Sequence, residues 1–441
     1  MITARVPLLL LVGVPVVPLV PSPWLGALAA VALPLALAAA DLLAAAPLSR
    51  LTAGRDGARV AWLGETVTVR LTLTNGSPRR LRCLLRDAWV PSAGAGPYSH
   101  RLDLAPGEIR TVETVLTPTR RGDRSAVRVS IRSYGPMGLA YRQSRRRVAD
   151  ARTPPWTLRV LPRFASRRYL AEKLARLRVL DGTVAIRGRG QGTEFDALRE
   201  YVVGDDVRSI DWRASARRSD MVVRSWRPER DRRVLCVLDT GRTSAVRVGD
   251  EPRLDAAIDA SLLLAWIAAR AGDRVDLLAV DTAVRASVAG AGKRAWMWRL
   301  VSALAPLEPA LVETDFGLVA GEVMRRERKR ALVVLFTALE PAALGEGLLP
   351  VLPRLAARHR VVVASVQDPI LSRLAEGSAP DDADPVDRVY AAAAAHRALA
   401  ERDRVRAALA RHGVEVVDAP VESFASRVAD AYLAMKATGR L

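Results

Sequence analysis

The 441-residue sequence contains only two cysteines, Cys83 and Cys236, and only four histidines. Two cysteines exclude a disulfide framework, and no Cys/His spacing typical of a zinc site is present. Cys236 lies inside an apolar run, so we expect it to be a core residue. The protein is therefore expected to fold without disulfides and without a metal cluster.

Lysine is also scarce. Of 67 basic residues only Lys173, Lys293, Lys329 and Lys436 are lysines, and the net charge is +20. This charge favours an anionic partner, either nucleic acid or lipid headgroups. The arginines are scattered, however, as is typical of a GC-rich genome, and aromatic residues make up only 5%. We therefore do not expect nucleic acid to be the partner, although a basic surface would suit an anionic cytoplasmic leaflet.

Charged residues are absent from the 35 positions between Val6 and Ala40. A helix needs roughly 20 apolar residues to cross a bilayer. The turn signal Pro21-Ser22-Pro23 interrupts the run, which predicts a transmembrane helical hairpin over residues 1–45, with limbs Val6–Val20 and Trp24–Ala40. Because arginines flank both ends, we expect the inner or plasma membrane, with the soluble domains on the cytoplasmic side.

Two alternatives to the hairpin remain open. The first is a signal peptide that is cleaved near Ala29 or Ala32, which would export the rest of the chain. The second is a single membrane span with the body of the protein outside the cell.

Residues 57–160 carry the pattern of β-strands. Thr66–Thr74 alternates polar and apolar residues and ends in the turn dipeptide Asn75-Gly76. Further strands are predicted at Leu81–Trp89, Thr111–Leu116 and Ala126–Tyr134. Short strands separated by turn signals indicate a small antiparallel β-sandwich.

Residues 233–441 alternate between strands and helices. Apolar strands are predicted at Val234–Leu238, Val275–Val280, Ala331–Thr337, Val361–Val366 and Val414–Val417. Helices are predicted at Leu254–Ala271, Trp296–Leu304, Phe316–Arg328, Leu344–Ala357, Val386–Arg411 and Phe424–Met435. This alternation predicts an α/β doubly wound parallel sheet, in which ligands bind at the carboxyl ends of the strands.

Asp239 ends the first of these strands, and Gly241 and Thr243 follow it. An aspartate and hydroxyl residues at a strand end can present oxygens to a hard cation such as Mg²⁺. The segment resembles the metal-ion-dependent adhesion site of von Willebrand factor A domains, Asp-x-Ser-x-Ser. That resemblance implies a von Willebrand factor A-like fold for this part of the chain.

In the adhesion-site family a distant threonine and a later aspartate complete the site. Thr314 is the counterpart of the threonine, but Ala338 stands where the aspartate would be, and Gly241 lacks a hydroxyl. The resemblance therefore implies a partner-binding or degenerate metal site formed by Asp239, Gly241, Thr243 and Thr314. We expect no cofactor, with Mg²⁺ on Asp239 and Thr243 as the alternative. A purely structural role is open too, in which Asp239 caps the following turn.

Residues 161–232 are predicted to be a basic connector that holds the densest motif in the sequence. The stretch from Leu198 to Arg217 resembles the signature of the bacterial family called domain of unknown function 58. The matching residues are Arg199, Glu200, Tyr201, Gly204, Asp205, Asp206, Arg208, Asp211, Trp212 and Arg213. The stretch from Tyr134 to Leu139 also resembles a turn of that family, so the resemblance extends over nearly the whole chain.

This signature allows three interpretations. Its alternating charges could form a partly buried ion-pair network with Trp212 packed beneath, acting as a structural clasp. Alternatively, Trp212 and the arginines could anchor a recognition surface. Acid–base catalysis by Asp205, Asp206 or Asp211 is the third interpretation, although no nucleophile or histidine accompanies them.

The family resemblance implies a membrane-anchored, non-catalytic protein that binds another protein. Members of the family often accompany MoxR-type AAA+ ATPases, which implies a role in assembling or activating other protein complexes. Two alternatives are kept: a nucleic-acid or anionic-surface binding protein, and a hydrolase that uses the Asp-rich signature.

Overall fold

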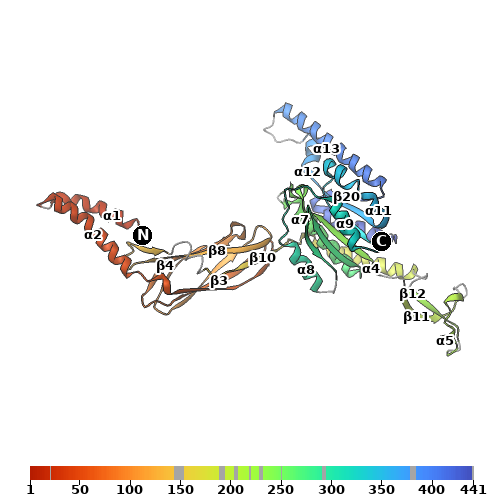
Figure 1. Cartoon of the computed structure of the whole chain (residues 1–441), viewed down its shortest axis with the longest axis horizontal. Helices are drawn as coiled ribbons and strands as arrows, with labels where there is room; N and C mark the ends of the chain where they lie inside the picture. The colour runs from red at the N-terminus through yellow and green to blue at the C-terminus, as the bar shows by residue number, and fades with distance from the viewer. Residues whose placement is uncertain are drawn as a thin grey trace. The chain divides into compact units, whose positions relative to one another are not determined.

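The computed structural model describes residues 1–439 except 20, 144–152, 188–193, 203–206, 218–219, 228–231, 250, 291–294 and 378–383. The chain forms two compact units, Met1–Leu161 and Pro162–Leu441 (Figure 1). The first contains the apolar N-terminal helices and two β-sheets, and the second contains a mixed sheet with helices.

The N-terminal segment folds back on itself. Helix α1 (Arg5–Gly13) continues into a 3-10 helix, η1 (Val14–Leu19), and helix α2 (Pro23–Ala44) returns alongside it (Figure 1). A Cβ atom on Gly13 would lie 3.3 Å from the Cβ of Ala30, so the helices are in close contact there. The chain therefore forms the helical hairpin that the sequence predicted, with two limbs that differ in length and helix type.

Only α2 is long and apolar enough to cross a membrane among the residues that the structure describes. The candidate span, Pro23–Arg50, has a mean hydropathy of 2.1, and a signal sequence near the N-terminus can have the same length and composition. Helix α1 has nine residues, or about 14 Å at 1.5 Å per residue, against about 30 Å of hydrocarbon. The prediction of a helical first limb up to Val20 is corrected, because the limb with Pro15 and Pro18 becomes a 3-10 helix.

Asp41, near the end of α2, joins this segment to the β-sheets. Its buried carboxylate accepts hydrogen bonds from the backbone N–H groups of Met137 (2.7 Å), Leu139 (2.7 Å) and Ala140 (2.9 Å). A side chain at Gly135 would place its Cβ 2.3 Å from the Asp41 carboxyl carbon, so only glycine fits there. The turn that resembles the family pattern thus holds the end of the apolar helix.

Two sheets form a sandwich after α2. One has the order β1-β3-β7-β5, with bounds Leu51–Gly57, Val67–Asn75, Ile109–Leu116 and Ala95–Gly96. The other has the order β2-β10-β8-β4-β6, with β9 beside β8, and bounds Val60–Trp62, Thr157–Leu161, Gly122–Tyr134, Leu81–Trp89, Ser99–Leu104 and Tyr141–Gln143. Leucines from both sheets, including Leu71, Leu73, Leu81 and Leu85, form the core between them. All four strands predicted here are present, and the first strand begins at Leu51, before the expected boundary at residue 57. The neighbours β2 and β10 are parallel, which corrects the prediction of a wholly antiparallel sandwich.

The second unit contains a six-stranded sheet in the order β17-β16-β13-β18-β19-β20. The bounds in chain order are β13 Arg233–Asp239, β16 Arg274–Val280, β17 Val284–Val288, β18 Leu332–Phe336, β19 Arg360–Gln367 and β20 Glu415–Pro420. Every neighbouring pair is parallel except β16–β17, which corrects the prediction of a purely parallel sheet. Numbered from β13, the order is 3-2-1-4-5-6, so the connections reverse direction between β13 and β18.

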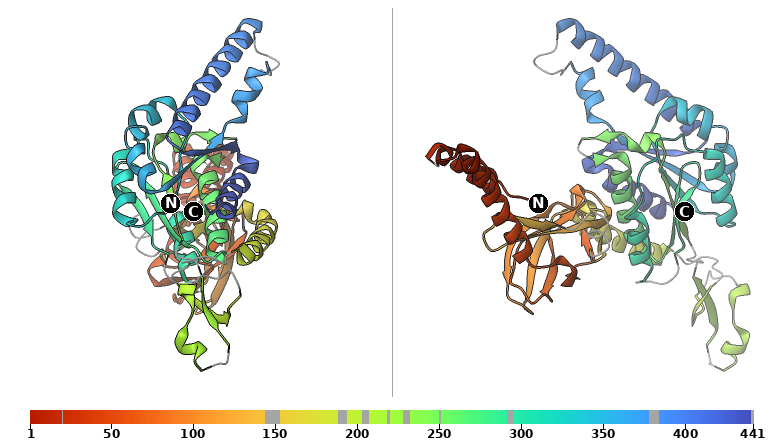
Figure 2. Two further views of the ribbon diagram at one scale, coloured as in Figure 1. Left: turned by 90° about the vertical axis from the view of Figure 1, so that its right-hand side faces the viewer. Right: turned by 60° about the vertical axis from the view of Figure 1, so that its left-hand side comes forward.

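Helices cover both faces of this sheet (Figure 2). One face packs against α9 (Phe316–Arg326), α11 (Leu352–Arg358) and the second half of α13 (Pro385–Arg411). The other face carries α7 (Arg253–Arg270) and α14 (Val421–Ala437), with Phe336 against Phe424. The other described helices after β13 are α6 Arg242–Ala245, α8 Ala295–Leu304, α10 Pro341–Ala343, the π-helical turn η6 Leu344–Leu348, and α12 Pro369–Ala375.

Two predictions for this unit need correction. The helix expected at Leu344–Ala357 is divided into η6 and α11, because Pro350 and Pro353 interrupt it. The connector expected at residues 161–232 contains α4 (Leu170–Arg187), which packs on α7 and α14. It also contains an antiparallel pair, β11 (Glu194–Glu200) with β12 (Val222–Arg227).

His359, between α11 and β19, is 3% exposed, and neither ring nitrogen has a hydrogen-bond partner among the described residues. Burial lowers the pKa of His359, and the charge of Arg358 lowers it further. The unfolded chain, with a histidine pKa of about 6.5, therefore binds the proton more readily than the folded chain, so stability is lost as the pH falls below that value.

We expect the urea concentration at the midpoint of unfolding to decrease as the pH is lowered from 7 to 5. The decrease should be smaller in the variant His359→Leu. Urea unfolding of both proteins across this range measures the difference. An equal fall in the two proteins would contradict the assignment.

Candidate functional site

Asp239 lies at the carboxyl end of β13, where the strand connections reverse direction. One carboxylate oxygen accepts hydrogen bonds from the backbone N–H of Gly241 (2.8 Å) and from the Thr314 hydroxyl. The other accepts from the hydroxyls of Thr243 (3.2 Å) and Thr337 (2.6 Å). Asp239 is 2% exposed, so its charge is enclosed by donors and not presented to solvent.

The four residues that the sequence suggested for this site, Asp239, Gly241, Thr243 and Thr314, are close together in the structure. Gly241 fits because a Cβ atom there would lie 2.2 Å from the Thr314 hydroxyl oxygen. A serine at this position, as in the adhesion-site pattern, would therefore collide with the threonine.

Thr337 is the site residue that sequence reasoning missed. The family pattern directs attention to position 338, but Thr337 directly follows β18 and donates to Asp239, while Ala338 is buried. The available signal was a hydroxyl residue at the end of the strand next to β13. Since neighbouring parallel strands end at one edge of a sheet, such a residue lies within reach of Asp239.

The oxygen atoms gathered around the Asp239 carboxylate suit two roles. One carboxylate and three hydroxyls are all oxygen ligands, of the kind that Mg²⁺ accepts together with water. Both carboxylate oxygens are, however, already satisfied by N–H and O–H donors. These bonds connect the loop after β13, the loop before α9 and the end of β18, so Asp239 positions three loops of one edge.

The neighbouring carboxylate, Asp281, follows β16 and is paired. Arg285 donates to both of its oxygens (2.9 and 2.7 Å), and the Thr240 hydroxyl donates at 3.1 Å. Burial alone would raise the pKa of Asp281, but the hydrogen bonds from Arg285, the Ala283 N–H and Thr240 outweigh it and lower the pKa. Asp281 is therefore charged at neutral pH, neutralised by Arg285, and engaged in holding its own loop.

The loop before α9 crosses over Asp239 and presents an apolar side chain. Ala310 donates from its backbone to the Thr240 carbonyl (2.7 Å), and Arg242 donates from its backbone to the Val312 carbonyl (2.8 Å). Between these two tethers Leu311 is 80% exposed. Leu311 is therefore held outward at the carboxyl ends of the strands, the place where open α/β sheets bind their ligands.

The family signature lies on the β11–β12 pair and the segment between its strands. Gly204, Asp205 and Asp206 lie outside the described residues, and so does the side chain of Arg199. Glu200, Arg208 and Arg213 are exposed, and Tyr201 is half-buried.

The contacts of Asp211 and the exposure of Trp212 differ from those expected for a structural clasp. Asp211 caps the short helix α5 (Trp212–Ser215) by accepting from the backbone N–H groups of Arg213 (3.1 Å) and Ala214 (3.0 Å). Trp212 is 64% exposed, so the expectation that it packs beneath an ion-pair network is wrong. A helix of one turn covers too little surface to bury an indole. The Asp211 carboxylate therefore has a structural role as a helix cap. Acid–base catalysis by Asp211, as in the hydrolase interpretation, would not require such a cap.

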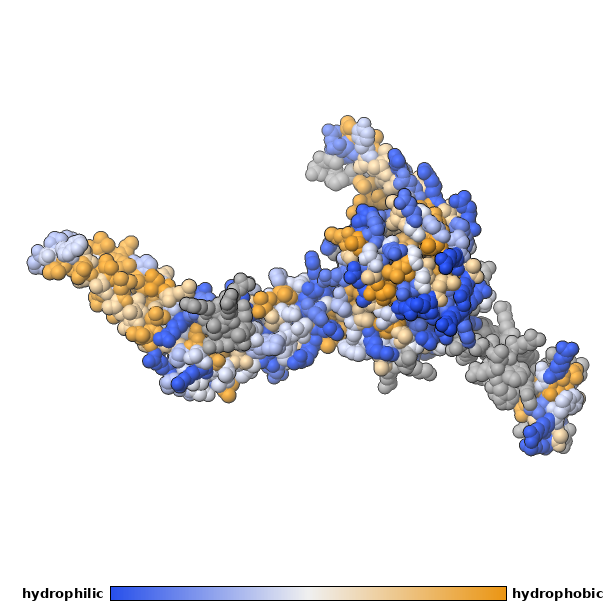
Figure 3. Space-filling view, viewed as in Figure 1, coloured by the Kyte–Doolittle hydropathy of each residue, from blue (hydrophilic) through white to orange (hydrophobic). Residues whose placement is uncertain are grey.

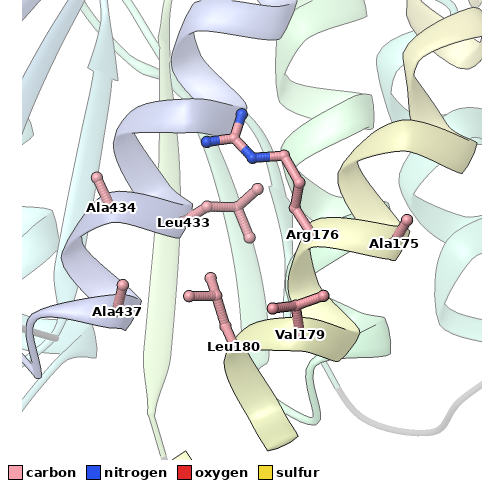
Figure 4. A pocket seen from close by; sticks show the side chains of 7 residues that line it. All are labelled: Ala175, Arg176, Val179, Leu180, Leu433, Ala434 and Ala437. Carbon is pink, nitrogen blue, oxygen red and sulfur yellow. The ribbon is translucent and has the colours of Figure 1, made fainter. Parts of the chain in front are cut away.

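A groove of about 380 Å³ lies elsewhere, between α4 and α14 (Figure 4). It is lined by Ala175, Arg176, Val179, Leu180, Leu433, Ala434 and Ala437. Arg176 is the only polar side chain in this lining, and it pairs with Asp430. The groove therefore lacks the convergent polar groups of a catalytic pocket.

Residues 197–415 match the family model described as "Protein of unknown function DUF58". The match covers just under half of the chain and includes most of the β11–β12 pair as well as strands β13 to β19. Asp239, Thr243, Thr314 and Thr337 all lie within this DUF58 segment.

Related sequences occur in mycobacteria. Uncharacterized proteins of Mycobacterium bovis and Mycobacterium tuberculosis are 27% identical over 183 residues, which is 41% of this chain. The matched region spans 56% of the length of these relatives.

Two of the similar solved structures match about a quarter of the chain. A fragment of Escherichia coli alpha-2-macroglobulin is 20% identical, with a TM-score of 0.22, and covers 27% of this chain and 17% of that one. The CARDB domain of a Pyrococcus furiosus protein is 13% identical, with a TM-score of 0.20, and covers 26% of this chain and 94% of that one.

Proposed function

We propose that this chain is a membrane-anchored, non-catalytic protein that binds a protein partner through a von Willebrand factor A-like domain. The observation that carries this proposal is the Asp239 cluster, defined as Asp239, Thr243, Thr314 and Thr337. It lies at the carboxyl ends of β13 and β18, between which the strand connections reverse direction, and open α/β sheets bind their ligands at such a point.

In this proposal Asp239 acts as a positioning residue and Leu311 makes the contact. The buried carboxylate fixes Thr314, and with it the loop that holds Leu311 outward. The exposed ion pair of Arg242 with Glu313 lies beside that loop and forms the polar rim. An apolar anchor inside a polar rim is the usual arrangement of a protein interface.

The contact is proposed to be independent of metal. If Mg²⁺ were bound, Asp239, Thr243, Thr314 and Thr337 would be the ligands, and the cation would replace their mutual hydrogen bonds. The cluster carries one carboxylate, and the donors around it already satisfy that charge.

The partner is proposed to be a MoxR-type AAA+ ATPase, and the process the assembly or activation of other protein complexes. The resemblance to the family supports this choice of partner. Helix α2 is proposed to hold the chain in the inner or plasma membrane, with the sheet domains on the cytoplasmic side; its length and composition support the anchor.

Affinity capture with the full-length chain from detergent-solubilised membranes of its host tests the proposal. We expect the wild-type chain to capture a MoxR-type ATPase, and Leu311→Asp to reduce that capture at least about tenfold, because a charge at an interface centre costs more than about 1.4 kcal/mol. Added chelator should leave capture unchanged.

The matched control is Ile109→Asp, which changes a 62% exposed aliphatic residue on β7 and should leave capture intact. Equal capture by the Leu311 and Ile109 variants would refute the contact surface. Loss of capture on chelation would contradict the metal-independent contact.

A further inference from the structure

A second surface of the α/β unit carries four exposed arginines. Arg328 and Arg330 lie in the loop that enters β18, and Arg354 and Arg358 lie on α11, just before β19. All four are exposed, and we call them the amino-edge cluster. Figure 3 shows hydrophilic residues gathered over the region where α9 and α11 lie in Figure 1.

The fold brings these four arginines together from separate parts of the chain. Strands β18 and β19 are parallel neighbours, with Leu332 opposite Arg360, so the segments that enter them lie side by side. Arg358 donates through its guanidinium to the carbonyl of Arg328 at 2.6 Å, which joins the two segments directly. Arg354 lies one helical turn before Arg358 and shares its face of α11.

The four amino-edge arginines differ in their pairing from three arginines at the carboxyl ends of the strands. At the carboxyl edge Arg242, Arg253 and Arg285 pair with Glu313, Glu340 and Asp281, respectively. None of the four amino-edge arginines forms an ion pair with a carboxylate in the part of the chain that the structure describes. Like charges one turn apart on a helix repel each other, so the cluster is not there for stability.

We propose that the amino-edge cluster binds the anionic headgroups of the bilayer in which the chain is anchored. This inference rests on the membrane anchor of the proposed function. Arginine guanidinium groups form paired hydrogen bonds with phosphate oxygens, and basic clusters near a bilayer are attracted to its anionic lipids. The cluster contains no aromatic side chain on which an unpaired base could stack, which favours lipid over single-stranded nucleic acid.

The consequence is a fixed orientation of the α/β unit. Parallel strands place their amino ends at one edge and their carboxyl ends at the other, so the cluster and Leu311 lie at opposite edges of the same sheet. Headgroups that hold the amino edge therefore leave the Asp239 cluster and its loop facing away from the bilayer, where a soluble ATPase can reach them.

The test uses the full-length chain in nanodiscs of phosphatidylcholine, with or without 30 mol% phosphatidylglycerol, that contain a nitroxide-labelled headgroup lipid. A fluorophore on Ala357→Cys, an exposed position next to Arg358, reports contact with headgroups, because Cys83 and Cys236 are buried. We expect strong quenching only in the anionic discs, reversal by 0.5 M salt, and at least fivefold weaker quenching when all four arginines of the cluster become glutamine.

The matched control replaces Arg397, Arg404, Arg406 and Arg411, four exposed arginines of α13, with glutamine. It removes the same charge and should quench like the wild type. Equal quenching in both quadruple variants would overturn the lipid contact. Equal quenching in discs with and without phosphatidylglycerol would overturn it as well. Binding of an RNA oligonucleotide that the cluster variant loses, without quenching, would reassign the cluster to nucleic acid. A chain that does not insert into the discs would instead contradict the membrane anchor. Flotation of that chain with anionic vesicles would then test whether the amino-edge cluster binds anionic lipid.

Discussion

Asp239→Ala is expected to lower the free energy of unfolding by about 3 kcal/mol and to abolish partner capture. The substitution leaves four donors at the end of β13 without an acceptor, among them the buried Gly241 N–H and the buried hydroxyls of Thr243 and Thr337. Each buried donor without a partner costs about 1–3 kcal/mol, partly recovered when solvent enters the loops. Urea unfolding followed by tryptophan fluorescence measures this loss.

Asp315→Ala is the matched control for this experiment. Asp315 is an exposed aspartate that caps α9 by accepting from the Leu318 N–H at 2.9 Å, so its loss should cost about 1 kcal/mol. Asp239→Asn keeps one acceptor oxygen, so its loss of unfolding free energy should lie between those of Asp239→Ala and Asp315→Ala. If Asp239→Ala were no more destabilising than Asp315→Ala, the cluster would not hold the three loops together.

Asp41→Ala is expected to cost about 3 kcal/mol in the N-terminal unit and to loosen α2 from the sandwich. The three N–H groups of Met137, Leu139 and Ala140 lose their common acceptor, the fully buried Asp41 carboxylate. Amide hydrogen exchange at these residues should accelerate at least tenfold, because their N–H groups no longer have a hydrogen bond that must break before exchange.

Asp56→Ala provides the comparison. Asp56 is an exposed aspartate that pairs with Arg70 at 3.2 Å, and an exposed pair of this kind is worth less than about 1 kcal/mol. Its loss should leave exchange at the turn unchanged. Equal exchange in the wild type and in Asp41→Ala would mean that other contacts hold α2 in place.

The sequence predicted most of the elements of the fold because their periodicity is strong. Short, valine-rich runs such as Val234–Leu238 and Val361–Val366 are typical of strands in a sheet covered on both faces, and both strands are present. Strand β17 (Val284–Val288) was missed because its outward residues are polar or small and it pairs only with β16. The buried pair of Arg55 with Asp87 was equally invisible, since 32 positions separate the two residues and only the sheets bring them together.

The candidate site was predictable where a motif was local and was missed where it depended on three-dimensional neighbours. Asp239 and Thr243 belong to one short pattern, and Thr314 follows from the family resemblance. Thr337 enters the site only because β18 pairs with β13, which periodicity alone does not reveal. The exposure of Leu311 depends on two backbone tethers to the loop after β13, and no residue pattern encodes them.

Site-specific photo-crosslinking in living cells tests the central proposal most directly. A benzophenone amino acid at position 311 of the full-length chain is compared with the same probe at position 109. We expect position 311 to form a crosslinked product that contains a MoxR-type AAA+ ATPase, and position 109 to form none. Identical products from the two positions, or no ATPase product from position 311, would contradict a partner contact at the Asp239 edge of the sheet.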